Sequence, residues 1–140
     1  MKFGIGFGVL SVVYSSIAVS ILSALGLNFS GGILGDKNVN YVRVFITAVV
    51  AAPIIEEFLF RTLPIKLFAS HTKIVQNIVI FLTSFVLFGW LHGGPQFMLI
   101  QGVTGLLYAY VYLKRGYFTS VIAHATHNAI VVTLIILFSI

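Results

Sequence analysis

The segment from Phe3 to Leu27 contains no charged residue, and this uninterrupted apolar run limits the folds open to the chain more than any other feature. A helix of about 20 apolar residues crosses the hydrocarbon of a bilayer, whereas the apolar part of a cleavable signal peptide spans only about 7–15 residues. We therefore predict that the segment is a retained first membrane span.

The remainder of the chain has the same character. Hydrophobic residues make up 59% of the sequence, charged residues make up 8%, and the mean hydropathy is +1.10. Soluble domains carry about 25% charged residues. Because backbone polar groups in a bilayer must be hydrogen-bonded within the protein, we predict an all-α, polytopic membrane helical bundle.

The apolar segments and the breaks between them indicate how this bundle is organised. We expect about five transmembrane helices, at 3–27, 41–63, 74–91, 97–113 and 118–140. The longest loop, at 28–40, collects glycine, asparagine, aspartate and lysine, which break helices and favour water. The prediction is a single membrane domain at 1–140, with a first span and loop at 1–40 and a motif-bearing core at 41–140.

The net charge of +5 does not indicate nucleic-acid binding, because the basic residues are spread over the loops rather than gathered in a patch. Their distribution favours a cytoplasmic N-terminus and cytoplasmic loops at 64–73 and 114–117 under the positive-inside rule. We therefore expect an integral protein of the cell (plasma) membrane. Cysteine is absent, which excludes a disulfide framework and a thiolate nucleophile.

Two of the three acidic residues, Glu56 and Glu57, lie side by side in an apolar stretch. A carboxylate in a membrane helix costs several kcal/mol unless it is paired or faces a polar cavity, so it is by default a candidate functional group. Arg61 lies four residues after Glu57, on the same helix face, whereas Glu56 points about 100° away. We therefore predict that Glu57 is paired and Glu56 is the working carboxylate. Pro53, one turn earlier, removes a backbone hydrogen bond beside them.

Histidines accompany these carboxylates on later helices. His92 ends the third expected span, and Phe88 lies four residues before it on the same face. His124 and Asn128 form a second such pair in the fifth span, and His127 lies about 90° from their line. A lone histidine in a membrane helix is often only a contact between helices. With a glutamate on another helix, however, these side chains can converge from three helices on one cavity.

This set of side chains favours hydrolysis. A carboxylate and a histidine that share a water can act as a general base and its partner. The donors of His124 and Asn128 can bind the oxyanion that forms when water attacks a peptide carbonyl. Zinc held by Glu56, His92 and His124 is the alternative, although the helical H-E-x-x-H arrangement of many zinc proteases is absent.

Three motifs in this order on successive apolar helices resemble those of the CPBP family, which comprises type II CAAX prenyl endopeptidases and Abi-like bacteriocin-processing or immunity proteins. The motifs are Glu56-Glu57-x-x-x-Arg61, Phe88-x-x-x-His92 and His124-x-x-x-Asn128. The region that resembles the family runs from about Tyr41 to Ile140. The resemblance implies an all-helical intramembrane endopeptidase.

In such a protease Glu56 and His92 would activate water, and His124 and Asn128 would stabilise the oxyanion. The resemblance gives Glu57, Arg61 and Phe88 supporting roles. It further implies glutamate-type chemistry with no required cofactor, although the family has long carried the label metalloprotease, with zinc as the alternative. The expected partners are the lipid bilayer and a peptide or lipidated protein substrate.

Other functions fit the same residues less well. A non-catalytic immunity or binding protein could keep the scaffold, and a proton-linked transporter could use membrane Glu and His, but no internal repeats support a transporter. Only one span precedes the motif helices here, fewer than in many family members. A homo-oligomer or a partner membrane protein could therefore complete the structure.

Overall fold

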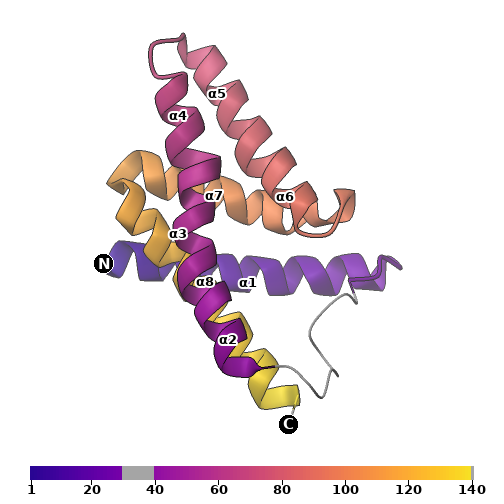
Figure 1. Cartoon of the computed structure of the whole chain (residues 1–140). Coiled ribbons are helices and arrows are strands. Elements are labelled where there is room, and N and C mark those ends of the chain that lie inside the picture. The colour runs from indigo at the N-terminus through magenta and orange to yellow at the C-terminus, as the bar shows by residue number, and fades with distance from the viewer. Residues whose placement is uncertain (30–39, 140) are drawn as a thin grey trace.

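The computed structural model describes residues 1–29 and 40–139, and within them every regular element is a helix (Figure 1). The elements follow in the order α1 (Lys2–Ala24), α2 (Tyr41–Phe45), η1 (Ile46–Ala51), α3 (Ala52–Glu57), η2 (Phe58–Thr62), α4 (Leu63–Leu67), α5 (Lys73–Phe81), η3 (Leu82–Leu87), α6 (Phe88–Leu91), η4 (Pro95–Leu99), α7 (Gln101–Arg115) and α8 (Tyr117–Ser139). The predicted all-α membrane bundle is confirmed. Most of the predicted loop at 28–40 lies outside the described residues.

Several of these elements join end to end. Residues 41–67 form one continuous helix, the motif helix, in which π-helical turns at η1 and η2 flank α3. Figure 1 shows it running the length of the molecule to the turn that leads into α5. Residues 73–91 form a second continuous helix, again with a π-helical middle at η3. A π turn bonds residue i to i+5, which widens the helix and is frequent at functional sites.

In the part of the chain that the structure describes, three helices are long and apolar enough to cross a membrane, namely Lys2–Ala24, Lys73–Leu91 and Tyr117–Phe138. They coincide with three of the five predicted spans. The motif helix is long enough, but its middle carries Glu56, Glu57 and Arg61. α7 has 15 residues, a rise of about 22 Å, which is shorter than the about 30 Å of hydrocarbon. The chain is an integral membrane protein, and these three helices are its membrane-spanning candidates.

Two predicted boundaries were wrong. The motif helix continues to Leu67 instead of ending near Leu63. Pro64 directly follows the wide π turn at η2, and local π turns of this kind accommodate a proline inside a membrane helix. The fourth helix begins at Gln101 rather than at 97, because Pro95–Leu99 forms a short 3-10 helix after a glycine turn with φ of 148° and 99°. Only glycine adopts such backbone angles at low cost.

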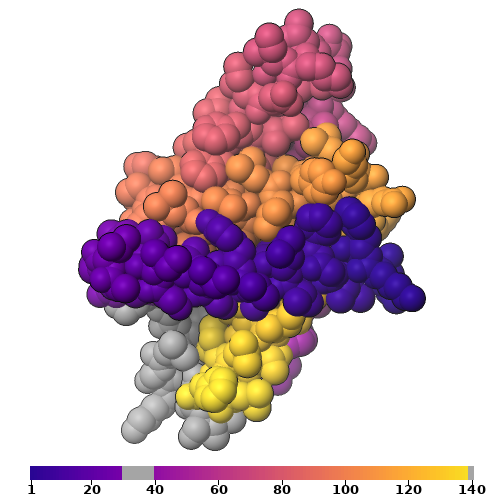
Figure 2. Space-filling view, turned by 180° about the vertical axis from the view of Figure 1, so that it is seen from behind, coloured from indigo at the N-terminus to yellow at the C-terminus, as the bar shows by residue number. Residues whose placement is uncertain are grey.

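α8 is the central helix, and α1, α7 and the motif helix all pack against it. Figure 2 shows α1 lying across the back of the molecule, against α7 and α8. The close approach of α1 requires glycine, because a Cβ on Gly8 would lie 2.5 Å from the carbonyl oxygen of Ala123. The buried core at this junction comprises Tyr108, Val111 and Ala123. The side chains that α8 carries toward the motif helix are therefore held from behind by α1 and α7.

Candidate active site

The predicted site residues come from three of these packed elements. Glu56 lies in α3 of the motif helix, His92 caps the end of α6, and His124 lies in α8. One carboxylate oxygen, Glu56 Oε2, lies 3.8 Å from His92 Nε2 and 3.7 Å from His124 Nε2. The structure therefore places His92 and His124 beside one oxygen of Glu56. The spacing in the sequence could suggest this convergence but could not establish it.

The carboxylate of Glu56 has no direct hydrogen-bonding partner for this oxygen among the described residues. Direct hydrogen bonds between nitrogen and oxygen span about 2.7–3.2 Å, so both histidines stand too far away to bond it. Polar groups separated by more than about 3.5 Å are commonly bridged by water. The side chain of Glu56 keeps 25% of its surface exposed, although Oε2 itself is buried.

Hydrogen bonds at the Nδ1 atoms of the two histidine rings determine that the Nε2 atoms face Glu56. His92 Nδ1 lies 2.6 Å from the carbonyl oxygen of Phe88, which can only accept, so Nδ1 carries the hydrogen. His124 Nδ1 lies 2.9 Å from Glu57 Oε1, a carboxylate paired with Arg61, so it carries a hydrogen as well. In neutral rings both Nε2 atoms then present lone pairs toward Glu56. Three acceptors around one point suit a species that donates, such as water.

Glu57 anchors the buried half of the site. Its side chain is fully buried, and its Oε1 lies 3.2 Å from Nη1 of the equally buried Arg61, as the i,i+4 spacing predicted. The hydroxyl of Ser120 donates to the other oxygen, Glu57 Oε2, over 2.5 Å. Glu57 therefore accepts hydrogen bonds from Ser120 and His124 and forms an ion pair with Arg61.

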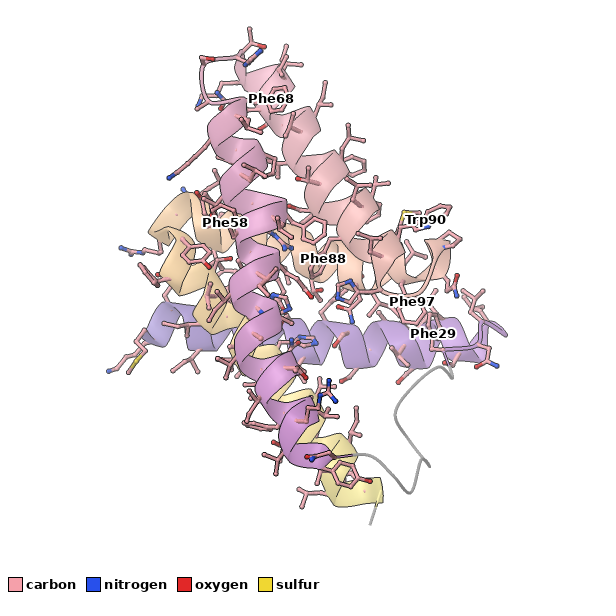
Figure 3. All side chains as sticks on the ribbon, viewed as in Figure 1. Phe29, Phe58, Phe68, Phe88, Trp90 and Phe97 are labelled. Carbon is pink, nitrogen blue, oxygen red and sulfur yellow. The ribbon has the colours of Figure 1, made fainter. Side chains whose placement is uncertain are left out.

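Arg61 and Phe88 complete this support. The guanidinium of Arg61 stands over the Phe88 ring, 4.2 Å from its centroid, and donates to the carbonyl oxygen of Gly105 over 3.1 Å. Phe88 is fully buried beside the middle of the motif helix (Figure 3), and its ring contacts both His92 and His124. A cation over an aromatic face is stabilised by the ring quadrupole, most strongly where water is excluded.

Asn128 lies one turn beyond His124 and contacts the motif helix rather than Glu56. Its Nδ2 donates to the carbonyl oxygen of Ala48 over 2.7 Å. In the π register of η1 this carbonyl would pair with the N–H of residue 53, which is proline and has none. The amide of Asn128 therefore satisfies the backbone group that Pro53 leaves unpaired, and uses one of its two N–H groups to do so.

Two residues of the site were missed in the sequence. Ser120 lies four residues before His124, so the stripe Ser120, His124 and Asn128 on one face of α8 was a signal that could have identified it. Tyr108 stacks on the His124 ring with centroids 4.7 Å apart and an angle of 18° between the planes. Nothing in the spacing of Tyr108 distinguishes it from an ordinary packing residue of an apolar helix.

The zinc alternative required Glu56, His92 and His124 to act as ligands. Among the described residues, no group of three His, Cys, Asp or Glu side chains is placed so that it could hold a metal ion. The distances of 3.7 and 3.8 Å between the candidate ligand atoms exceed the about 3.4 Å that tetrahedral zinc with bonds of about 2.0–2.1 Å would impose. The alternative stays a prediction that metal analysis can test.

Comparison with known proteins gives one family match. Residues 38–130 match the model of the Rce1-like family, described as type II CAAX prenyl endopeptidase Rce1-like. This range contains all of the site residues described above and excludes α1. Searches of curated proteins and of solved structures each found no match.

Proposed function

Because the chain belongs to the Rce1-like family of type II CAAX prenyl endopeptidases, we propose that it is an intramembrane endopeptidase that hydrolyses a peptide bond with a water activated by Glu56 and histidine. The observation that carries the proposal is the convergence of His92 Nε2 and His124 Nε2 on Glu56 Oε2, which has no hydrogen-bond partner among the described residues. A water at this point can donate one hydrogen to Glu56 and the other to a histidine nitrogen.

In the proposed reaction this water attacks the carbonyl carbon of the scissile bond. Glu56 takes a proton from the water as the new carbon–oxygen bond forms, and that proton passes to the leaving amine as the carbon–nitrogen bond breaks. A positioned general base contributes about 10²–10⁴-fold to such a step. His92, whose Nδ1–H is held by a backbone carbonyl, keeps its Nε2 lone pair directed at the water.

We assign stabilisation of the oxyanion to two residues of α8, Asn128 through its second N–H group and His124, as the family resemblance suggested. Since Glu57 holds Nδ1–H of His124, Nε2 can donate to the oxyanion only in the imidazolium form, so we propose that His124 takes up a proton from solvent before the water attacks and keeps it through the reaction. Glu57 would then balance the imidazolium charge, as the carboxylate of a catalytic triad does. This refines the sequence-based expectation that a neutral His124 is the donor.

The substrate is proposed to be a membrane-associated peptide or a lipidated protein, since the helices that carry the site are apolar outside and the site lies among them. The basic loops at 64–73 and 114–117 further lead us to propose a plasma-membrane protein with a cytoplasmic N-terminus. A homo-oligomer or a partner membrane protein is also part of the proposal, given the small number of helices.

The function can be tested by isotope incorporation. The purified protein in lipid nanodiscs is mixed with prenylated and unprenylated peptides in water enriched in ¹⁸O, and the products are weighed by mass spectrometry. Hydrolysis should place one ¹⁸O atom in the new C-terminal carboxyl group of the N-terminal product and none in the C-terminal fragment that is released. Peptide binding without any product would instead identify a binding or immunity protein on this scaffold.

Metal analysis separates the two mechanisms. We expect the purified protein to contain no stoichiometric zinc and to keep its cleavage rate after extensive dialysis against a chelator. One tightly bound zinc per chain, with activity lost on its removal and restored by its addition, would instead make Glu56, His92 and His124 metal ligands. The protein treated with chelator and then reloaded with zinc serves as the control for damage during dialysis.

A further inference from the structure

We infer that Ser11 on α1 is a positioning residue for His124, acting through Tyr108 and His127, so that α1 forms part of the catalytic unit. The inference rests on the proposed function, since it concerns the aim of a ring that is proposed to act on the substrate. α1 lies outside the residues matched by the family model, and no motif of the chain assigns it a role beyond that of a membrane span.

Ser11 is fully buried and makes three polar contacts at once. Its Oγ lies 2.7 Å from the carbonyl oxygen of Gly8, 2.8 Å from His127 Nδ1 and 3.2 Å from the hydroxyl of Tyr108. A carbonyl can only accept, so the single hydroxyl hydrogen of Ser11 goes to Gly8. Tyr108 and His127 must then both donate to the two lone pairs of Ser11. All donors and acceptors of the hydroxyl are used.

This assignment makes Ser11 the acceptor that orients the Tyr108 side chain. The Tyr108 ring is nearly parallel to the His124 ring, with an angle of 18° between the planes, and stands almost edge-on to His127 at 85°. Tyr108 is buried, with 1% of its surface exposed, so its hydroxyl depends on a partner within the protein rather than on bulk solvent. The position of this one ring therefore depends on a contact from α1.

The stacked contact matters because the hydrogen bond to Glu57 does not by itself fix the orientation of the His124 ring. Nδ1 is held by Glu57, but rotation of the ring about this hydrogen bond would still move Nε2 away from Glu56. Tyr108 covers one face of the ring, while Phe88 meets it edge-on with centroids 5.7 Å apart. Stacked and edge-on aromatic contacts contribute beyond their buried area. Together they fix the plane in which Nε2 points at Glu56 Oε2.

The packing of α1 makes this contact rigid. Gly4 and Gly8 lie against α8 so closely that a Cβ at either position would stand within 2.7 Å of a backbone oxygen of α8. Ser11 follows on the same buried face, one turn after Gly8. The contact with Ser11 also gives a role to His127, which the sequence placed about 90° from the line of His124 and Asn128 on α8. That histidine points toward α1 and supports the far side of the Tyr108 contact.

A merely structural role for Ser11 would loosen helix packing, whereas a positioning role would change catalysis without changing substrate binding. The test is Ser11→Ala, with Ser15→Ala as the matched control. Ser15 lies on the same buried face of α1, but among the described residues its hydroxyl bonds only to Val12 of its own helix. Both variants are assayed under conditions where their thermal stabilities match.

For Ser11→Ala we expect kcat to fall about tenfold with KM unchanged, the scale of one lost buried hydrogen-bond acceptor. Tyr108→Phe keeps the stacked ring and should lower kcat less. The double variant should be no slower than Ser11→Ala alone, because the two changes interrupt one pathway. A kcat for Ser11→Ala equal to that of Ser15→Ala, a change confined to KM, or additive effects in the double variant would overturn the inference.

A second measurement does not depend on proteolysis. In protein labelled with ¹⁵N-histidine, Ser11→Ala should shift the ring signals of both His127 and His124, whereas Ser15→Ala should shift neither. A shift at His127 alone would show that the contact stops there and would overturn the positioning of His124. If the wild-type protein cleaves nothing, the proposed function fails, yet these signals still decide whether Ser11 controls the His124 ring.

Discussion

Replacement of Glu56 by glutamine is expected to abolish peptide hydrolysis and to leave the fold intact. Glutamine has nearly the same shape but cannot take a proton from water, so the loss should reach about 10³-fold or more in kcat. Stability should change little, because Glu56 Oε2 bonds to no side chain among the described residues and the group is partly exposed. Cleavage rate and thermal unfolding are measured on the same preparation.

Glu57→Gln is the informative comparison for this prediction. It makes the same chemical change at the adjacent residue. That residue is fully buried, forms an ion pair with Arg61 and accepts hydrogen bonds from His124 and Ser120. We expect this substitution to lower both stability and activity. Wild-type cleavage by Glu56→Gln would remove Glu56 from the mechanism, and an inactive Glu57→Gln protein of normal stability would show that the roles of the two carboxylates are reversed.

The helical architecture could be predicted from the sequence because composition and uninterrupted apolar runs determine it. The bounds of α1, the 73–91 helix and α8 lie within a few residues of the predicted spans. The end of the motif helix was mispredicted, because Pro64 was treated as a break. The π turn at Phe58–Thr62 that precedes this proline depends on how the helix packs, which local sequence does not reveal.

Within the site, the pairing of Glu57 with Arg61 followed from helical spacing, since both residues lie on one turn of one helix. The motifs could suggest that His92 and His124 approach Glu56, but they do not determine it, because the approach depends on how three helices pack. Contacts between segments that are distant in the sequence were the hardest to predict. Ser11 reaches Tyr108 and His127 across about a hundred residues of chain, and nothing in its own surroundings marks it.

The second large effect is expected at the buried ion pair. Arg61→Met removes the cation beside the fully buried Glu57, and a buried charge left without its partner costs about 3–5 kcal/mol of stability. Arg43→Met is the matched control, since Arg43 is an exposed arginine on the same helix and its loss should change stability by no more than about 0.5 kcal/mol. Thermal or denaturant unfolding in one detergent measures both.

The double variant Glu57→Leu/Arg61→Met separates stability from catalysis. Replacing a buried ion pair by apolar side chains of similar size is often neutral or stabilising, so most of the stability lost in Arg61→Met should return. Activity should not return, because His124 then lacks the carboxylate that holds Nδ1–H and directs Nε2 at Glu56. Loss of the carboxylate that orients a catalytic histidine lowers kcat by about 10⁴-fold in a catalytic triad, and we expect at least about 10²-fold here.

A stable double variant with wild-type kcat would mean that Glu57 serves only as the counter-ion of Arg61. Packing against Phe88 and Tyr108 would then be sufficient to orient the His124 ring.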